Sequence, residues 1–167
     1  LKMSQLTDNL TVTSVQTKKA LVKAFAKKRP AFLWGPPGIG KSELVAEICN
    51  EMGGHMIDLR MAQMEPTDIR GIPFFNKDLG VMDWAPPIEL PSEELASQYP
   101  IVVLFLDEMN SAMPAVQAAG YQLILNGRVG KYVLPENVVI VAAGNRDSDK
   151  GVTYRMPSPL GNRFVHL

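Results

Sequence analysis

Residues 35–42, GPPGIGKS, constrain the fold of this chain more than any other stretch. They match the pattern G-x-x-x-x-G-K-[ST], with an apolar run before them and a helical pattern after them. Glycine at positions 35, 38 and 40 lets the backbone wrap closely around phosphate oxygens, because no Cβ atom intervenes. The backbone N–H groups and the N-terminus of the following helix then face the anion. The predicted nucleotide-binding residues are Gly35, Pro36, Pro37, Gly38, Ile39, Gly40, Lys41 and Ser42.

Two side chains of this loop carry the remaining chemistry of a phosphate site. We expect Lys41 to reach the β- and γ-phosphates of ATP and the Ser42 hydroxyl to be a ligand of Mg²⁺. The alternative is a glycine-rich turn that binds nothing. Glycine makes up about 7% of protein residues, so chance would give this pattern in well under about one in a hundred chains of this length. The pattern therefore predicts a P-loop.

An acidic pair follows one of the two longest apolar runs of the chain. Asp107 and Glu108 come directly after residues 101–106, IVVLFL. Ligands of parallel sheets bind at the carboxyl ends of the strands, where these two side chains are expected. A carboxylate there can hold Mg²⁺, and its neighbour can deprotonate the water that attacks the γ-phosphate. The alternative is an acidic pair that only caps a strand. With a P-loop upstream, we interpret Asp107 as a metal ligand and Glu108 as the general base.

A polar residue also ends the next apolar run, residues 138–143, VVIVAA. This run leads into Gly144 and Asn145. A side-chain amide at this strand end would hydrogen-bond the attacking water and a phosphate oxygen, so Asn145 is a candidate catalytic residue. Gly-Asn is also an ordinary turn dipeptide, and without the other motifs that reading would be preferred.

Strands and helices alternate along the chain, which predicts a three-layer α/β fold with a parallel sheet. The middle of the chain, residues 60–100, is rich in proline and carries no long periodic segment, so a long functional or mobile loop is expected there. The basic stretch 23–29 is interpreted as the solvated end of a helix, with nucleic-acid contact as the alternative. The predicted strands are 31–34, 55–59, 101–106, 138–143 and 164–167, and the predicted helices are 13–28, 42–52 and 114–125.

The charge balance and the cysteine content narrow the functional class. The chain has 17 basic and 17 acidic residues, so no net field favours nucleic acid or an anionic membrane. Cys49 is the only cysteine, which fits a reducing compartment, and no apolar run approaches the roughly 20 residues that span a bilayer. We expect a cytoplasmic, soluble protein with one nucleotide-binding core domain over residues 1–167.

In their order and spacing, GPPGIGKS, LFLDEMN, VAAGN and PLGNRF resemble an AAA+ ATPase, and most closely the MoxR-type and dynein-related branch. The resemblance runs from residue 31 to the C-terminus. It implies that residues 35–42 are Walker A, that Asp107 and Glu108 are Walker B, and that Asn145 is sensor 1. It also implies a P-loop NTPase sheet with strand order 5-1-4-3-2, and a hexameric ring with ATP between neighbouring subunits.

The same resemblance assigns a role to the C-terminal segment. GVTYRMPSPLGNRF is similar to the family stretch that ends in an arginine finger, so Arg163 would reach the adjacent subunit's site in trans. The alternative is a surface arginine beside the last strand. Arg155 and Arg146 are weaker candidates for the same interface, and Arg146 departs from the proline that many relatives carry. Relatives continue into a helical lid, so the chain is expected to be truncated before it.

Two further segments are similar in position to segments of the family that this chain resembles. The proline-rich middle is similar in position to an insertion that marks this branch, and Phe74, Phe75 and Trp84 in it are either core residues or substrate contacts in a ring pore. Residues 127–131 fall where relatives carry a hairpin before sensor 1. The cations of that hairpin would touch a partner, or the segment is a solvated turn.

Three functions remain open at the level of sequence. The first is a magnesium-dependent, chaperone-like ATPase that remodels or matures a protein partner, with an adaptor that carries a metal-dependent adhesion domain as a plausible companion. The second is a nucleotide-dependent assembly switch or scaffold with slow hydrolysis, against which Glu108 and Asn145 argue mildly. The third is a DNA-associated motor or clamp-loader-like factor, which the neutral charge disfavours.

Overall fold

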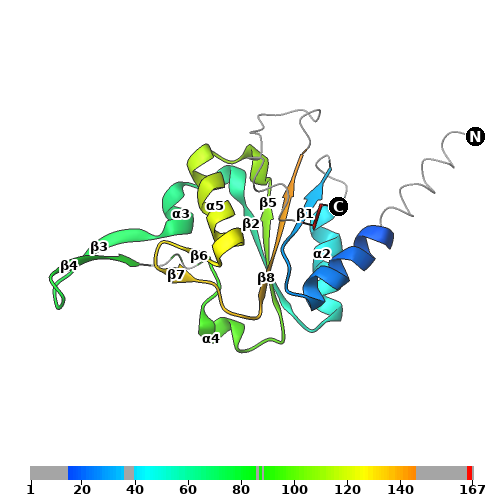
Figure 1. Cartoon of the computed structure of the whole chain (residues 1–167), viewed down its shortest axis with the longest axis horizontal. Coiled ribbons are helices and arrows are strands. Elements are labelled where there is room, and N and C mark those ends of the chain that lie inside the picture. Colours follow the sequence, from blue (N-terminus) through cyan, green and yellow to red (C-terminus); the bar gives the residue numbers. More distant parts are fainter. Residues whose placement is uncertain (1–14, 36–39, 86, 88, 146–164, 167) are drawn as a thin grey trace, which may run out of the picture.

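The protein is a three-layer α/β domain in the computed structural model, which describes residues 15–35, 40–85, 87, 89–145 and 165–166. Five parallel strands form the central sheet in the order β2-β5-β8-β1-β9. Their bounds are His55–Arg60, Val102–Asp107, Val138–Gly144, Ala31–Trp34 and Val165–His166. Numbered along the chain, this is the predicted order 5-1-4-3-2 read from the other edge, so the predicted fold class is confirmed (Figure 1).

The middle strands of the sheet are buried on both faces. Successive side chains of a strand point to opposite sides, and each side is covered by a layer of helices. In β5, Leu104 and Leu106 pack toward one layer of helices, while Val103 and Phe105 pack toward the other. Every residue of β8 is buried. Such continuous apolar runs are typical of parallel strands that are covered by helices on both faces.

Helix α2 (Lys41–Glu51) and the helical residues 15–26 cover one face of the sheet. Helix α5 (Pro114–Asn126) and the short helix α3 (Pro66–Arg70) lie on the opposite side (Figure 1). The predicted helices 42–52 and 114–125 are confirmed to within one residue at each end. The basic residues Lys23, Lys27, Lys28 and Arg29 are exposed at the end of the first helical segment, as predicted for a solvated helix end.

The prediction of a long loop without regular structure at residues 60–100 is wrong in detail. This segment contains a 3-10 turn η1 (Met61–Gln63), helix α3, an antiparallel hairpin of β3 (Ile72–Asn76) and β4 (Val81–Ala85), and helix α4 (Glu93–Ala96). Local capping explains why such short helices form. Glu65 and Asp68 form a capping box around the start of α3, and the Ser92 hydroxyl accepts a hydrogen bond from Leu95 N–H at the start of α4.

The β3–β4 hairpin projects away from the body of the domain (Figure 1). Phe74, Phe75 and Trp84 are 44%, 59% and 38% exposed, so their interpretation as core residues is wrong. A second hairpin, β6 (Arg128–Val129) and β7 (Tyr132–Val133), follows α5, where a hairpin was expected. In the described part of the chain, no helix is both long and apolar enough to cross a membrane.

Candidate functional site

A cavity of about 340 Å³ lies where β5 and β8 end and α2 begins. It brings together residues that are more than 100 positions apart in the sequence, and most of them are predicted site residues. Among the described residues, its lining includes Gly40, Lys41, Ser42, Glu43, Arg60, Asp107, Glu108, Gly144 and Asn145. Gly35 lies beside it at the end of β1, whereas the predicted positions Pro36, Pro37, Gly38, Ile39, Arg146, Arg155 and Arg163 lie outside the described residues.

The start of α2 depends on a glycine that other residues would replace only with strain. Gly40 precedes the helix with a φ of 80°, in the left-handed region, and its carbonyl accepts the hydrogen bond from Leu44 N–H at 3.0 Å. The other end of the loop is also fixed, because Gly35 N–H donates to the carbonyl of Gly144 at 3.1 Å. The described residues on both sides of the loop, Gly35 and Gly40, are therefore held in place, and the N-terminus of α2 is available to an anion.

Lys41 joins the two strand ends from the first turn of α2. Its ammonium donates to the carbonyl of Gly35 at 2.8 Å and to the carbonyl of Gly144 at 3.3 Å. The side chain is part-buried, so its charge acts in a setting of lower dielectric than water. This positions a cation at the mouth of the loop, where the terminal phosphates of a nucleotide are expected.

Ser42 and Asp107 both contribute oxygen ligands to the lining of the cavity. The Ser42 hydroxyl donates to Glu43 Oε2 at 3.2 Å, and Asp107 is the last residue of β5. Hydroxyl and carboxylate oxygens are the hard ligands that Mg²⁺ prefers, and this ion usually keeps several waters and substrate phosphates in its coordination shell. The donor set of the cavity thus fits Mg²⁺ bound together with a nucleotide.

Glu108 has a backbone conformation that is uncommon for a residue with a side chain. Its φ of 54° and ψ of 38° lie in the left-handed region, which costs about 1–2 kcal/mol for an L-residue. The side chain of Asp107 supports this turn, since its Oδ1 accepts the Glu108 N–H at 2.8 Å. Such outliers concentrate at functional sites, where the surrounding structure holds them in place.

Asn145 directly follows β8 and lines the cavity. Its main chain is held by the side chain of Asn110, a residue of the 3-10 turn η2 (Met109–Ser111) that follows Glu108. The parallel pairing of β5 with β8 brings the ends of both strands to the same edge of the sheet, as the sequence predicted. Asp107, Glu108 and Asn145 therefore line one cavity.

Arg60 is a lining residue that the sequence reasoning missed. It ends β2 and pairs in register with Asp107, so it brings a second cation to the cavity. The rule that ligands bind at the carboxyl ends of parallel strands applies to β2 as well and would have found it. Desolvation and then the charge of Asp107 raise the pKa of the nearby Asp58 above its ordinary value, whereas Arg60 acts in the opposite direction.

A comparison with protein families shows to which family the chain belongs. Residues 31–166 match the family described as ATPase family associated with various cellular activities (AAA), so the match covers most of the chain. The chain belongs to the AAA family of ATPases. Members of this AAA family bind ATP and typically oligomerise.

Two curated relatives match this chain over only part of their own length. This chain is 45% identical to the replication factor C large subunit of Ignicoccus hospitalis over 53 residues. The matched residues are 32% of this chain and 10% of that protein. This chain is 29% identical to the same subunit of Aeropyrum pernix over 123 residues. The matched residues are 69% of this chain and 23% of that protein. The chain thus spans less than a quarter of the length of these relatives.

A solved structure supports the fold of the AAA domain. It belongs to a protein of Cytophaga hutchinsonii whose assignment as an ATPase is itself provisional. The TM-score is 0.61 at 20% sequence identity, over 99% of this chain and 50% of that chain. At this level of identity the likeness concerns the fold alone.

Proposed function

We propose that this chain binds ATP with Mg²⁺ and hydrolyses it in the cavity at the ends of β5 and β8. The observation that carries the proposal is the convergence of Lys41, Ser42, Asp107, Glu108 and Asn145 on one cavity. Gly35, the loop after it and Gly40 would enclose the phosphates, while Ser42 and Asp107 would hold the ion. Mg²⁺, when bound, supplies electrostatic stabilisation of the charge that develops on the phosphates.

Each of the remaining polar side chains of the cavity would have a separate role in hydrolysis. Glu108 would accept the proton of the attacking water, and Asn145 would orient that water. Arg60 adds a guanidinium, a group that suits phosphate oxygens. Arg163 would come from a neighbouring subunit, so the working form is a ring, with six subunits as the expected number.

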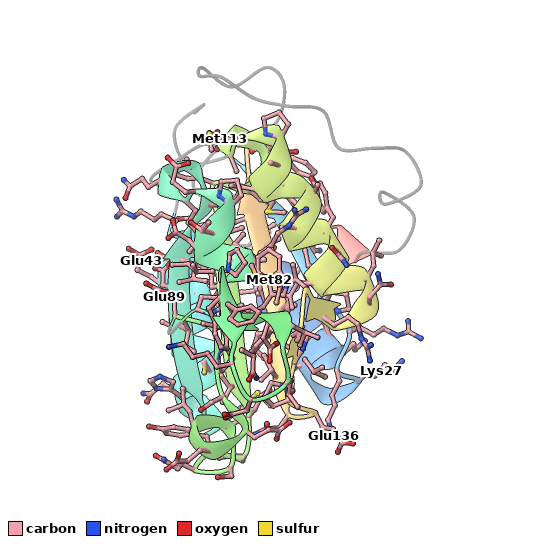
Figure 2. The ribbon with its side chains drawn as sticks, turned by 90° about the vertical axis from the view of Figure 1, so that its left-hand side faces the viewer. Lys27, Glu43, Met82, Glu89, Met113 and Glu136 are labelled. Carbon is pink, nitrogen blue, oxygen red and sulfur yellow. The ribbon has the colours of Figure 1, made fainter. Side chains whose placement is uncertain are left out.

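Replacing Lys41 by alanine tests the phosphate site itself. We expect ATP to bind about 10- to 100-fold more weakly, because the variant loses a charged hydrogen bond worth about 1.5–3 kcal/mol and each 1.4 kcal/mol is a factor of ten. Calorimetry with Mg²⁺-ATP measures this affinity directly. Lys27→Ala is the matched control, since Lys27 is an exposed lysine on a distant part of the surface (Figure 2). Unchanged affinity in the Lys41 variant would remove the basis of the proposal.

We further assign the chain to the MoxR-like and dynein-related branch, whose members act on protein partners. The support is the β3–β4 hairpin, which comes between β2 and β5 in the order of the chain. That branch carries its insertion at the same point of the chain. The cross-strand pairs Pro73–Trp84 and Phe75–Met82 place four apolar side chains on one face of this hairpin. Met82 is 61% exposed and is labelled on the hairpin in Figure 2.

The hairpin is better suited to contacts through side chains than to the addition of another strand. Pro73 has no N–H group to donate, and the N–H of the opposite residue, Trp84, donates to Asp83 Oδ1 at 2.9 Å. Edge strands with such features resist pairing with further strands. The apolar face carries no charged side chain, so it fits an apolar segment of polypeptide and not the phosphates of a nucleic acid.

The double variant Phe75→Ser with Met82→Ser tests this partner surface. Each of the two side chains contributes about 1.5–3 kcal/mol when fully buried, so we expect at least tenfold weaker binding of a permanently unfolded probe, reduced and carboxymethylated α-lactalbumin. Fluorescence anisotropy of the labelled probe in the presence of ATP measures the change.

A control replaces two exposed apolar residues outside the hairpin, Val22→Ser with Met52→Ser, which are 40% and 37% exposed. Thermal melts establish that both double variants fold. Equal binding of the probe by the hairpin variant and the control would contradict the assignment of the hairpin as the partner surface, whatever the outcome for Lys41.

A DNA-associated factor is the second candidate, because both curated relatives are replication factor C large subunits. The neutral balance of charge and the uncharged face of the hairpin weigh against it. A gel shift at low salt with a short DNA duplex, with and without ATP, separates the two candidates. Binding that requires ATP would favour the DNA-associated function.

A further inference from the structure

Asn110 is a buried amide outside the cavity lining whose contacts reach the site. Its side chain is 2% exposed, and both ends of its amide group bond to the main chain of Asn145. Oδ1 accepts the Asn145 N–H at 3.0 Å, and Nδ2 donates to the Asn145 carbonyl. This pair of bonds resembles one rung of a sheet ladder, added just beyond the end of β8.

The surroundings leave this side chain little room to move. A Cβ atom on Gly144 would lie 2.5 Å from Asn110 Oδ1, so the glycine permits the close approach of the amide to the strand. From the other side, Gln117 of α5, which is 5% exposed, donates to the carbonyls of Asn110 and Ala112 at 3.3 and 3.2 Å. The contact is therefore buried, and α5 supports the turn that carries Asn110.

Because of its position in the chain, Asn110 connects the segment of Glu108 to the segment of Asn145. It lies two residues after Glu108, whereas Asn145 belongs to a segment 35 residues away. The bonds use only the main chain of Asn145, so they do not occupy its side-chain amide. They fix the distance between the segment that carries the carboxylates and the segment that carries the amide.

We propose that Asn110 is a positioning residue for hydrolysis, which holds Asn145 in register with Glu108. The inference rests on the proposed ATPase function and extends it to a residue that touches no nucleotide. A small displacement of a catalytic group costs rate more than binding, since a misplacement of about 1 Å can lower the rate about 100-fold. Loss of Asn110 is therefore expected to lower kcat and to leave KM nearly unchanged.

The test measures steady-state ATP hydrolysis by the full-length protein with Asn110→Ala. We expect kcat to fall about 10- to 100-fold, with KM within about threefold of the unchanged protein. Asn137→Ala is the control, because the Asn137 amide also makes two hydrogen bonds to main-chain carbonyls, those of Ala96 and Tyr99, at 2.8 and 2.9 Å. These bonds are part-buried and lie at the other end of the sheet. This control is expected to lower the melting temperature similarly but to keep kcat.

A double-mutant cycle with Asn145→Ala separates positioning from a general loss of stability. If Asn110 acts through Asn145, the change Asn110→Ala has little further effect on kcat once the Asn145 side chain is absent. Additive losses, or a loss in Asn110→Ala no larger than in Asn137→Ala, would overturn the inference while the role of Asn145 stands. If Asn145→Ala alone keeps full activity, the role of Asn145 fails, and the positioning role fails with it.

Asn110→Asp provides a second variant in case the alanine variant does not fold. The carboxylate has the same shape and still accepts the Asn145 N–H, but it cannot donate to the Asn145 carbonyl. We expect a lower kcat and an unchanged KM here too. A kcat equal to that of the unchanged protein would contradict the proposal.

Discussion

Replacing Glu108 by glutamine is expected to lower the turnover of ATP by about 10²- to 10⁴-fold while ATP still binds. The glutamine has nearly the same shape but cannot accept the proton of the attacking water. The carboxylate of Glu108 lines the same cavity as Lys41 and Asp107, and its backbone is held in the left-handed region. Phosphate release at saturating Mg²⁺-ATP measures the loss, and calorimetry measures the retained affinity.

Glu43→Gln is the control for Glu108→Gln, because it removes one negative charge from the lining of the same cavity. We expect its effect on turnover to be less than tenfold. A similar loss in both variants would mean that turnover depends on the charge of the cavity and not on a base at position 108. Full activity of Glu108→Gln would assign the base to another residue.

Replacing Arg163 by alanine is expected to lower turnover about 10³-fold or more in the assembled protein, on the scale known for arginine fingers. Nucleotide binding by a single subunit should remain, because the finger would act on the neighbour's site. Arg163 lies outside the described residues, so the prediction rests on the resemblance of its segment to that of other AAA+ proteins. Phosphate release at several protein concentrations, together with binding at low concentration, measures both effects.

Arg128→Ala is the matched control for Arg163→Ala, since Arg128 is an exposed arginine on β6. In the unchanged protein, a finger in trans predicts that specific activity rises with concentration. A flat rate that Arg163→Ala lowers equally at all concentrations would argue for a residue that acts within one subunit. A flat and negligible rate in both proteins would instead favour the assembly switch.

The parallel sheet and most of the site could be predicted because local patterns encode them. The apolar runs before Gly35, Asp107 and Gly144 are long enough to predict buried strands, and the carboxyl ends of such strands meet at one edge. The pairing of β5 with β8, which brings Asp107 close to Asn145, follows from that rule. The strand order itself came from the resemblance, and the structure confirms it.

Other features could not be predicted because they depend on contacts between distant segments. The Asn110 side chain finds its partner 35 residues away, and no periodic pattern marks such a pair. In the β3–β4 hairpin, Pro73 interrupts the pattern of a strand, and the exposed Phe75 and Met82 oppose the usual preference for burial. Both departures concern residues that we assign to function, where local and global preferences commonly disagree.

The left-handed backbone at Glu108 has a consequence for how this protein tolerates change. Glycine would adopt that conformation without strain and would favour the folded state, yet it would lack the carboxylate. With Glu108 as the proposed general base, selection for thermal resistance and selection for turnover would act on this position in opposite directions, a trade-off that is common where an enzyme holds a reactive group in an unfavourable geometry.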